Sequence, residues 1–236
     1  MQPTRPEFDA HSGSYEDLLC DPIRERFSGG GVAFFHTRKR DLIREFFRRR
    51  RIDTRALAYL DLGCGKGELA TALRGDFSRV AGCDLSAGMI EAGGLGRQGM
   101  DVRLQTDPAR IPFEDACFDL VTAVCVFHHV PPVARTALTA EVRRVLKPNG
   151  VFAIIEHNPY NPVTRRIVNR TPVDSGAILL KPAESRALLA ENGFSVESQS
   201  YFLYLPQSLY RRIGLLESAL AKLPLGGQYA VFSRAL

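Results

Sequence analysis

The sequence predicts a doubly wound α/β domain. We expect a seven-stranded, mostly parallel sheet that ends in an antiparallel strand, with an N-terminal helical lid. The main observation is that short apolar segments alternate with segments whose apolar residues recur at helical spacing. The fourth apolar segment, 117–127, is continuous, as expected of a strand buried on both faces of a parallel sheet. A chain of 236 residues is long enough to bury one continuous core.

Each strand is expected where an apolar run meets glycine or a polar residue. The first two strands occupy 56–63 and 78–86, and the helix-compatible segment 66–76 separates them. Ser86 is expected to cap the helix that follows the second strand. The third strand, 101–107, is less apolar. This strict alternation implies right-handed crossovers between parallel strands.

After the fourth strand, residues 133–147 carry apolar side chains at helical spacing, and the Pro-Asn-Gly sequence at 148–150 ends the predicted helix. A fifth strand follows at 151–158. The two closing strands are expected at 194–205 and 228–236 and supply the antiparallel end of the sheet.

Two insertions interrupt this pattern. Residues 158–180 contain several prolines and little periodicity, which predicts an irregular excursion near the carboxyl edge of the sheet. Residues 205–226 predict a helical insertion. We therefore expect a helical lid over 1–52 and the main domain over 53–236.

The composition is typical of a soluble globular protein, with 24% charged and 45% hydrophobic residues. No apolar run approaches the roughly 18 residues that span a bilayer, and the start of the chain lacks the apolar stretch of a secretory signal. A cytoplasmic location without a membrane partner is expected. The five cysteines are an odd number without a C-x-x-C pair, which predicts neither a disulfide framework nor a metal site.

Much of the net charge of +5 lies in 37–53, where basic residues alternate with apolar ones. The apolar residues at helical spacing are Leu42, Ile43, Phe46 and Phe47. They predict an amphipathic helix with a solvated basic face, and an anion-binding face is the alternative. His36 and Lys39, near the start of this helix, are interpreted as solvated, with contact to an acidic ligand group as the alternative.

A glycine-rich turn follows the first strand, with the sequence LDLGCGKGEL at 60–69. It is not the dinucleotide fingerprint G-x-G-x-x-G, because Glu68 occupies the third glycine position. A phosphate near Asp61 and Glu68 would be unfavourable, since like charges about 4 Å apart at an effective dielectric near 20 repel by roughly 4 kcal/mol. Asp84, at the end of the second strand, is suited to accept hydrogen bonds from both hydroxyls of a ribose. The pattern therefore favours a nucleoside with a positively charged tail.

Four segments resemble the successive motifs of class I S-adenosylmethionine-dependent methyltransferases, in the order of that family. They are the turn at 60–69, AGCDLSAGMI at 81–90, TDPARIPFEDACFDLVTAVCVFHHV at 106–130 and LKPNGVFAIIEH at 146–157. A glycine turn alone occurs in many α/β folds, so the resemblance depends on all four motifs in register. It implies a Rossmann-like fold, S-adenosylmethionine as cofactor and S-adenosylhomocysteine as product.

The resemblance also implies which residues hold the cofactor. Those expected to contact its methionine part are Asp61, Gly63, Gly65, Cys125 and Phe127. Cys64 is also expected to bind the cofactor, and Tyr15 is expected to approach it from the N-terminal helix. Those expected around its ribose and adenine are Asp84, Leu85, Met89, Asp107 and Pro108. Gly67 is expected to allow close helix packing.

Methyl transfer from a sulfonium is an in-line displacement on an activated carbon, so the protein mainly aligns the reactants and excludes water. A hydroxyl acceptor must also lose a proton, and a base assists this step. The candidate bases are three histidines at strand ends, His128, His129 and His157. We expect methyl transfer to a small molecule, at a hydroxyl oxygen.

The chain around 158–180 resembles a bacterial subgroup tied to the synthesis of glycans or secondary metabolites. This resemblance implies that Tyr160, Arg165 and Arg166 line the acceptor pocket, and that the arginines suit a phosphate or carboxylate on the acceptor. His11, in an N-terminal segment similar to that of small-molecule methyltransferases, is expected near the same pocket.

Two other functions stay open. An RNA methyltransferase is disfavoured, because CVFHHV ends the fourth strand in place of a nitrogen-directed NPPY or DPPY sequence. No nucleic-acid partner is expected. A non-catalytic S-adenosylmethionine-binding partner protein would bind the cofactor without turnover. The acceptor, the methylated atom and the choice between monomer and homodimer are left undecided.

Overall fold

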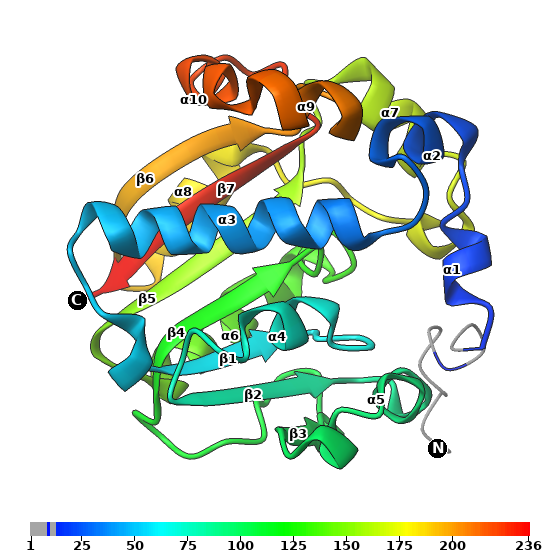
Figure 1. Cartoon of the computed structure of the whole chain (residues 1–236). Helices are drawn as coiled ribbons and strands as arrows, with labels where there is room; N and C mark the ends of the chain where they lie inside the picture. Colours follow the sequence, from blue (N-terminus) through cyan, green and yellow to red (C-terminus); the bar gives the residue numbers. More distant parts are fainter. Residues whose placement is uncertain (1–8, 10–12) are drawn as a thin grey trace.

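The computed structural model describes residue 9 and residues 13–236 (Figure 1). Its strands are β1 (Ala58–Leu62), β2 (Arg79–Asp84), β3 (Asp101–Leu104), β4 (Phe118–Val124), β5 (Leu146–His157), β6 (Phe194–Phe202) and β7 (Gln228–Ala235). These seven strands form one sheet in the order β3-β2-β1-β4-β5-β7-β6. β7 is antiparallel to both of its neighbours, and the other adjacent pairs are parallel. The predicted sheet is therefore confirmed.

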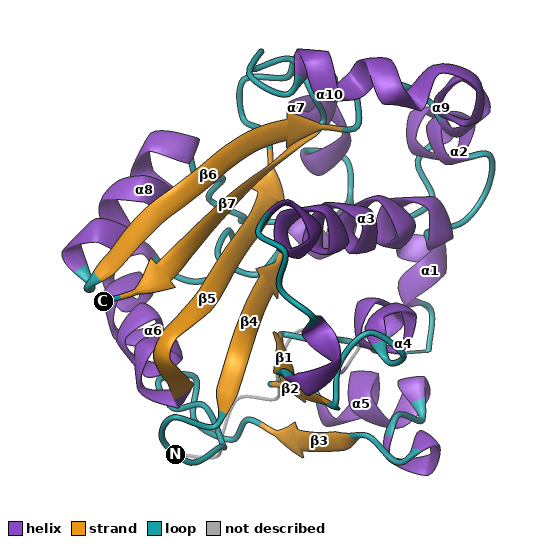
Figure 2. Ribbon diagram, turned by 60° about the vertical axis from the view of Figure 1, so that its left-hand side comes forward, coloured by secondary structure: helices purple, strands orange, loops and turns teal. Residues whose placement is uncertain are grey.

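Helices cover both faces of the sheet. They are α1 (Tyr15–Leu18), α2 (Pro22–Ser28), α3 (Ala33–Arg49), α4 (Glu68–Leu73), α5 (Ala87–Gly93), α6 (Pro132–Val145), α7 (Pro162–Val168), α8 (Pro182–Glu191), α9 (Gln207–Ile213) and α10 (Glu217–Leu220), with short 3-10 turns η2 (Thr54–Ala56), η3 (Gly96–Gln98), η4 (Pro172–Asp174) and η5 (Gly214–Leu216). Figure 2 shows α6 and α8 against one face and α3, α4 and α5 against the other. Within the described residues, no helix is both long enough and apolar enough to cross a bilayer.

α3 is the predicted amphipathic helix, and it lies across one face of the sheet (Figure 1). Its residues Ile43, Phe46 and Phe47 are buried. The ring of Phe46 stacks on that of Phe232 in β7, with centroids 4.4 Å apart. The apolar side of α3 is thus part of the sheet's core. We expected the whole segment 1–52 to form a lid. Because α3 packs on the sheet, α1 and α2 are the helices of this segment that remain candidates for a lid.

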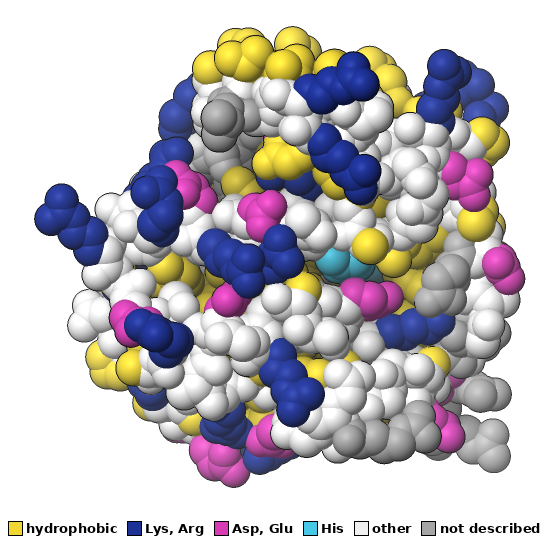
Figure 3. All heavy atoms as spheres, viewed as in Figure 1, with side chains coloured by type: hydrophobic (Ala, Val, Ile, Leu, Met, Phe, Trp, Pro, Cys, Tyr) yellow, Lys and Arg dark blue, Asp and Glu magenta, His cyan; other side chains and the backbone are white. Residues whose placement is uncertain are grey.

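The arginines on the outer side of α3 face acids. Arg44 donates two hydrogen bonds to Asp76, and Arg48 and Arg49 both donate to Glu45. Figure 3 shows acidic side chains beside several lysine and arginine side chains on this side of the molecule. Because these cations already have anionic partners, the structure favours a solvated basic face over an anion-binding one.

The segment 158–180, predicted to be irregular, contains the short helix α7. Asn161 caps this helix by accepting hydrogen bonds from the backbone N–H groups of Val163 and Thr164, at 2.8 and 3.0 Å. A helix of seven residues is too short to show clear periodicity in a proline-rich sequence. The helical insertion predicted after β6 is present as α9 and α10.

Candidate active site

The carboxyl ends of β1, β2, β4 and β5 lie at one edge of the sheet, and the strand order reverses there between β1 and β4. Ligands of open α/β sheets bind at such a point. A cavity of about 810 Å³ occupies this position, and residues of α1, α2, α3 and α7 complete its wall. Figure 1 places α1 and α2 on this side of the sheet. The volume is in the range of small-molecule sites.

Most of the residues that the sequence analysis assigned to the cofactor or the base line this cavity. They are Tyr15, Asp61, Gly63, Cys64, Gly65, Asp84, Leu85, Met89, Asp107, Pro108, Cys125, His128, His129 and His157. The structure does not place Gly67, Phe127, Tyr160, Arg165 or Arg166 in the lining. His11 lies outside the described residues. One space therefore holds both the expected cofactor residues and the three histidines.

The glycine-rich turn presents bare backbone to the cavity. The N–H groups of Gly63 and Cys64 donate to the carbonyl oxygen of Cys83, at 2.8 and 3.0 Å, which ties the turn to β2. Gly63 has a φ of 68°, and a Cβ atom there would lie 2.5 Å from Val126 Cγ2. A side chain at this position would therefore be strained and crowded.

Asp84 connects this turn to the start of α5. Its Oδ2 accepts a hydrogen bond from Gly65 N–H and its Oδ1 accepts one from Ser86 N–H, both at 2.8 Å. Burial raises the pKa of the Asp84 carboxyl. Each carboxylate oxygen keeps one lone pair for a further donor. The side chain is thus fixed in place and able to accept hydrogen bonds from two neighbouring hydroxyls.

Asp61 is the most buried acid near the turn, with 3% of its surface exposed. Its Oδ1 accepts a hydrogen bond from the Thr122 hydroxyl at 3.1 Å, and the hydroxyls of Thr122 and Tyr59 lie 2.8 Å apart. Burial raises the pKa of Asp61 to about 7. A cationic ligand group in the cavity would restore its charge.

Gly67 and Phe127 lie outside the lining of the cavity, and their roles are in packing. Gly67 has a φ of 78°, and a Cβ atom there would clash with the side chain of Leu95. The position therefore needs glycine for close packing. The Phe127 ring is fully buried, 6.1 Å from the Phe152 ring, and its backbone N–H donates to Glu156 Oε1 at 2.8 Å. The side chain of Phe127 packs in the core, away from the expected methionine part.

The three histidines meet two carboxylates at one end of the cavity. The Nδ1 atom of His128 lies 2.6 Å from Glu156 Oε2, and its Nε2 lies 3.4 Å from Asp174 Oδ1. The Nε2 atom of His129 lies 3.6 Å from the same Asp174 oxygen. The ring centroid of His157 is 5.1 Å from that of His128. Asp174 belongs to η4, in a segment to which the sequence analysis assigned no acid.

Burial and neighbouring charges shift the pKa values of His128 and His129 in opposite directions. Burial alone would lower the pKa of His128, but the Glu156 and Asp174 carboxylates outweigh it and hold this pKa well above the usual value. Burial and the neighbouring His128 lower the pKa of His129 to about 4. His128 is therefore fixed between two acids, whereas His129 is neutral near pH 7.

The cavity is enclosed by a side of α7 that the sequence analysis did not identify. Val163, Thr164 and Ile167 line the cavity. Arg165 and Arg166, which we expected there, line a separate shallow surface depression, and Tyr160 is also exposed. Once this segment is a helix, side chains next to each other in sequence point in different directions. These three residues therefore lie outside the lining of the cavity.

His36 and Lys39 also line the cavity, from the first turns of α3. Lys39 is 6% exposed, and Nδ1 of His36 is buried without a hydrogen-bond partner among the described residues. Burial and the Lys39 charge lower the pKa of His36 to about 3. Our interpretation of both residues as solvated is wrong, because Lys39 is buried and both side chains line the cavity. The sequence did contain a signal for their shared position, because an i, i+3 spacing places two side chains on the same face of a helix.

The sequence of residues 60–154 matches the family described as a methyltransferase domain. Over these residues the chain carries a methyltransferase domain. It is 35% identical to an uncharacterized methyltransferase, YcgJ, from Bacillus subtilis over 115 residues. These 115 residues are 47% of this chain and 45% of that protein. Over 131 residues it is 30% identical to a demethylmenaquinone methyltransferase from Lactobacillus johnsonii, 52% of each chain. The chain thus spans about half the length of these relatives.

Solved structures of methyltransferases share the fold over the whole chain. The magnesium protoporphyrin IX methyltransferase of Synechocystis PCC 6803, crystallised with S-adenosylhomocysteine, superposes with a TM-score of 0.67 over 98% of each chain. The sequence identity is 16%. At this identity the likeness concerns the fold, including the helices that precede β1.

The cavity of this methyltransferase domain fits the family's cofactor, S-adenosylmethionine. Asp84 has two oxygen lone pairs for ribose hydroxyls, and Asp61 supplies a buried carboxylate for a cationic tail. Gly63 and Gly65 present bare backbone to the same space. Leu85 and Met89 offer apolar surface beside them. These residues would hold the nucleoside and its amino-acid part.

Cys125, at the end of β4, lies between these residues and the histidines. Its backbone is left-handed, with a φ of 56°, and its Sγ accepts a hydrogen bond from Gln228 Nε2 at 3.3 Å. Burial alone would raise the pKa of Cys125, but His157 and Lys39 outweigh it and lower this pKa to about 7. A partly ionised thiol therefore faces the cavity beside His157.

Proposed function

We propose that this domain transfers a methyl group from S-adenosylmethionine to a hydroxyl oxygen of a small, largely apolar acceptor. The observation that carries this proposal is the continuity of the cavity. Its lining includes both the acids suited to a cationic nucleoside, Asp61 and Asp84, and the histidine group of His128, His129 and His157. A donor and an acceptor held in line within one enclosed space gain several kcal/mol toward the transition state.

The cavity has apolar walls beyond those that a nucleoside needs. Phe27 and Phe35 line it from the α2–α3 side, and Val163 and Ile167 line it from α7. These walls favour an acceptor with an apolar body. The similarity to a protein named demethylmenaquinone methyltransferase supports a fused aromatic ring as the first acceptor class to test. The arginines that suggested an acidic acceptor lie elsewhere.

S-adenosylmethionine, when bound, supplies a methyl group on a sulfonium, and its transfer to a hydroxyl yields a methyl ether, S-adenosylhomocysteine and one proton. His129 receives this proton in our proposal. Its ring is 26% exposed, and its Nε2 lies 3.6 Å from Asp174 Oδ1, which stabilises the imidazolium that forms. His128 is a poorer base because the Glu156 and Asp174 carboxylates hold its pKa well above the usual value, so that it already carries the proton near pH 7. The α1 and α2 helices exclude water.

The proposal is tested first by calorimetric titration with S-adenosylmethionine and S-adenosylhomocysteine. A panel of dihydroxynaphthalenes, phenols and aliphatic alcohols is then incubated with labelled S-adenosylmethionine, and S-adenosylhomocysteine is quantified by mass spectrometry. Magnetic resonance spectra of the product show whether oxygen or carbon carries the methyl group. His129→Asn should lower turnover by about 100-fold or more with unchanged cofactor affinity. Arg166→Gln, outside the cavity, is the matched control.

Three outcomes contradict the proposal in different ways. Failure of both nucleosides to bind would refute the donor site. Cofactor binding without turnover on any acceptor would leave a non-catalytic binding protein. Label transferred to RNA in the same assay, but to no small molecule, would favour the nucleic-acid alternative.

A further inference from the structure

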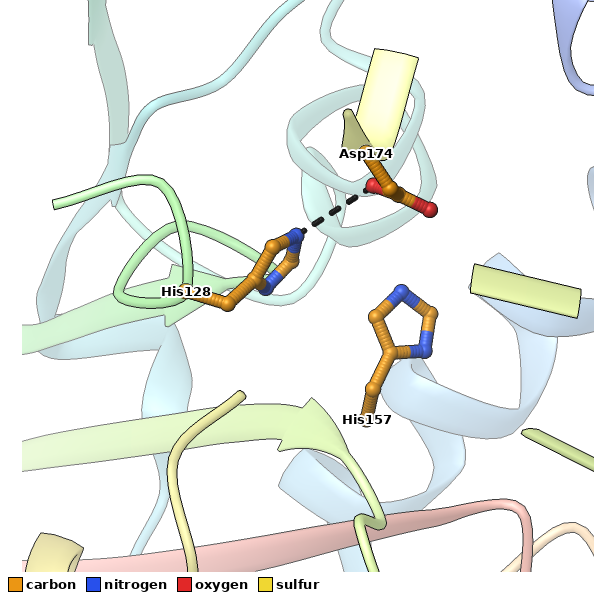
Figure 4. A group of neighbouring side chains, drawn as sticks. All are labelled: His128, His157 and Asp174. Atoms are coloured by element: carbon orange, nitrogen blue, oxygen red, sulfur yellow. Dashed lines mark ion pairs between the residues drawn. The ribbon is translucent and has the colours of Figure 1, made fainter. Parts of the chain in front are cut away.

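Three metal-ligating side chains converge at the histidine end of the cavity. His128 follows β4, His157 ends β5 and Asp174 lies in η4. A donor atom from each lies within 4.8 Å of the other two. Figure 4 shows the three side chains pointing toward one another. Because the donors come from three separate segments, the cysteine spacing that led us to expect no metal site does not report on them.

The orientation of His128 is fixed by its surroundings. Its Nδ1 lies 2.6 Å from Glu156 Oε2, and Glu156 is itself held by the N–H of Phe127 at 2.8 Å. The His128 side chain is 1% exposed, and its Nε2 has no hydrogen-bond partner among the described residues. A histidine bonded to a carboxylate through one ring nitrogen is the usual arrangement of a metal ligand and its supporting acid. A metal ion on Nε2 would take the place of the proton there.

The spacing of one donor pair, His128 and Asp174, fits a small cation. Two ligand atoms, each about 2.1 Å from a tetrahedral Zn²⁺, are separated by about 3.4 Å. His128 Nε2 and Asp174 Oδ1 lie 3.4 Å apart without forming a hydrogen bond. Two carboxylates, Glu156 and Asp174, face this group, and within the described residues their ion-pair partners are histidines. A divalent cation would balance both charges.

We propose that His128, His157 and Asp174 bind one divalent transition-metal ion, with Zn²⁺ as the reference ion. Two histidines and one carboxylate are a donor set of catalytic zinc sites, which keep a further position for water or substrate. The side chains of His157 and Asp174 line the cavity, so the further position faces the acceptor. The role of the ion rests on the proposed function: it coordinates the acceptor oxygen and lowers the pKa of its hydroxyl.

The test uses untagged full-length protein, stripped of metal with a chelator, without cofactor or acceptor. Calorimetric titration with Zn²⁺ measures stoichiometry and affinity, and the visible absorption of Co²⁺ reports the ligand set. We expect one Zn²⁺ per chain, with at least tenfold weaker binding in Asp174→Asn and in His157→Asn. The control is His36→Asn, because His36 is a buried histidine of the same cavity outside this group. Its Zn²⁺ affinity should equal that of the wild type.

Urea midpoints of all four proteins show whether a loss of binding reflects unfolding. No stoichiometric Zn²⁺ binding by the wild type, or equal binding by the Asp174→Asn and His157→Asn proteins, overturns the proposal. A strong thiolate-to-Co²⁺ charge-transfer band also overturns it, because it would place the ion on a cysteine such as Cys125. Cofactor binding is measured separately, so a protein that binds nucleoside but no metal refutes this inference and leaves the proposed function standing.

Discussion

Asp61 should make cofactor binding depend on pH. Its pKa is raised to about 7 by burial, so the empty site contains both protonation states near neutral pH. Only the carboxylate attracts the ligand's ammonium group, and affinity should therefore rise as the pH rises through 7. For a pKa of about 7, the ionised fraction grows about tenfold between pH 6 and pH 8, and the Asp61 contribution to the association constant grows with it.

Asp61→Asn isolates this effect. The amide resembles the protonated carboxyl, carries no charge at either pH and can still accept the hydrogen bond from Thr122. Calorimetric titration with S-adenosylhomocysteine, which keeps the ammonium group, is run on both proteins across this range. The ligand titrates identically in both experiments, so the ratio of variant to wild-type Kd should grow about tenfold from pH 6 to pH 8. A constant ratio in two equally stable proteins would refute the reasoning.

Two more predictions concern the glycine-rich turn and the acid beside it. Asp84→Asn should weaken S-adenosylhomocysteine binding at least about tenfold in calorimetry, because hydrogen bonds to a charged group contribute about 1.5–3 kcal/mol each. Gly67→Ala should lower the free energy of unfolding in urea by more than Gly99→Ala does. Both glycines have positive φ, 78° and 76°, which costs alanine about 1–2 kcal/mol, but an added Cβ clashes only at Gly67.

Each of these comparisons has a result that would contradict it. If Asp84→Asn binds the nucleoside as tightly as the wild type, Asp84 is not a ribose ligand. Equal losses of stability at Gly67 and Gly99 would show that the side chain of Leu95 moves aside without cost. That result would remove the packing reason for glycine at position 67.

The sheet and the position of the cavity could be predicted because both follow from local pattern. Alternating apolar segments specify parallel strands, and parallel strands bring their carboxyl ends to one edge. Asp61, Asp84 and Asp107 therefore share a cavity although they are far apart in sequence. Gly63 could be recognised from the spacing of the glycines in 60–69. The structure gives the reason for glycine there, because its φ of 68° and its closeness to Val126 exclude a side chain.

The acceptor end could not be predicted, because it depends on contacts between segments that have no fixed relation in sequence. Arg165 and Val163 lie two positions apart, and only the formation and docking of α7 decides that Val163 faces the cavity. Lys39 is buried because the packing of α3 on the sheet places it in the wall of the cavity. The motif sequence CVFHHV does not show that Phe127 turns inward to the core.

The sequence by itself thus determined the sheet and the methyltransferase domain, and it predicted residues suited to a cationic nucleoside, since these follow from periodicity and from the identity of residues at strand ends. Only the tertiary structure decided what surrounds the histidines. Asp174 was an unremarked residue of an insertion until the fold placed its carboxylate 3.4 Å from His128. The physical reason is that pKa, metal affinity and acceptor shape arise from distances between side chains of different segments, which packing sets and local pattern does not contain.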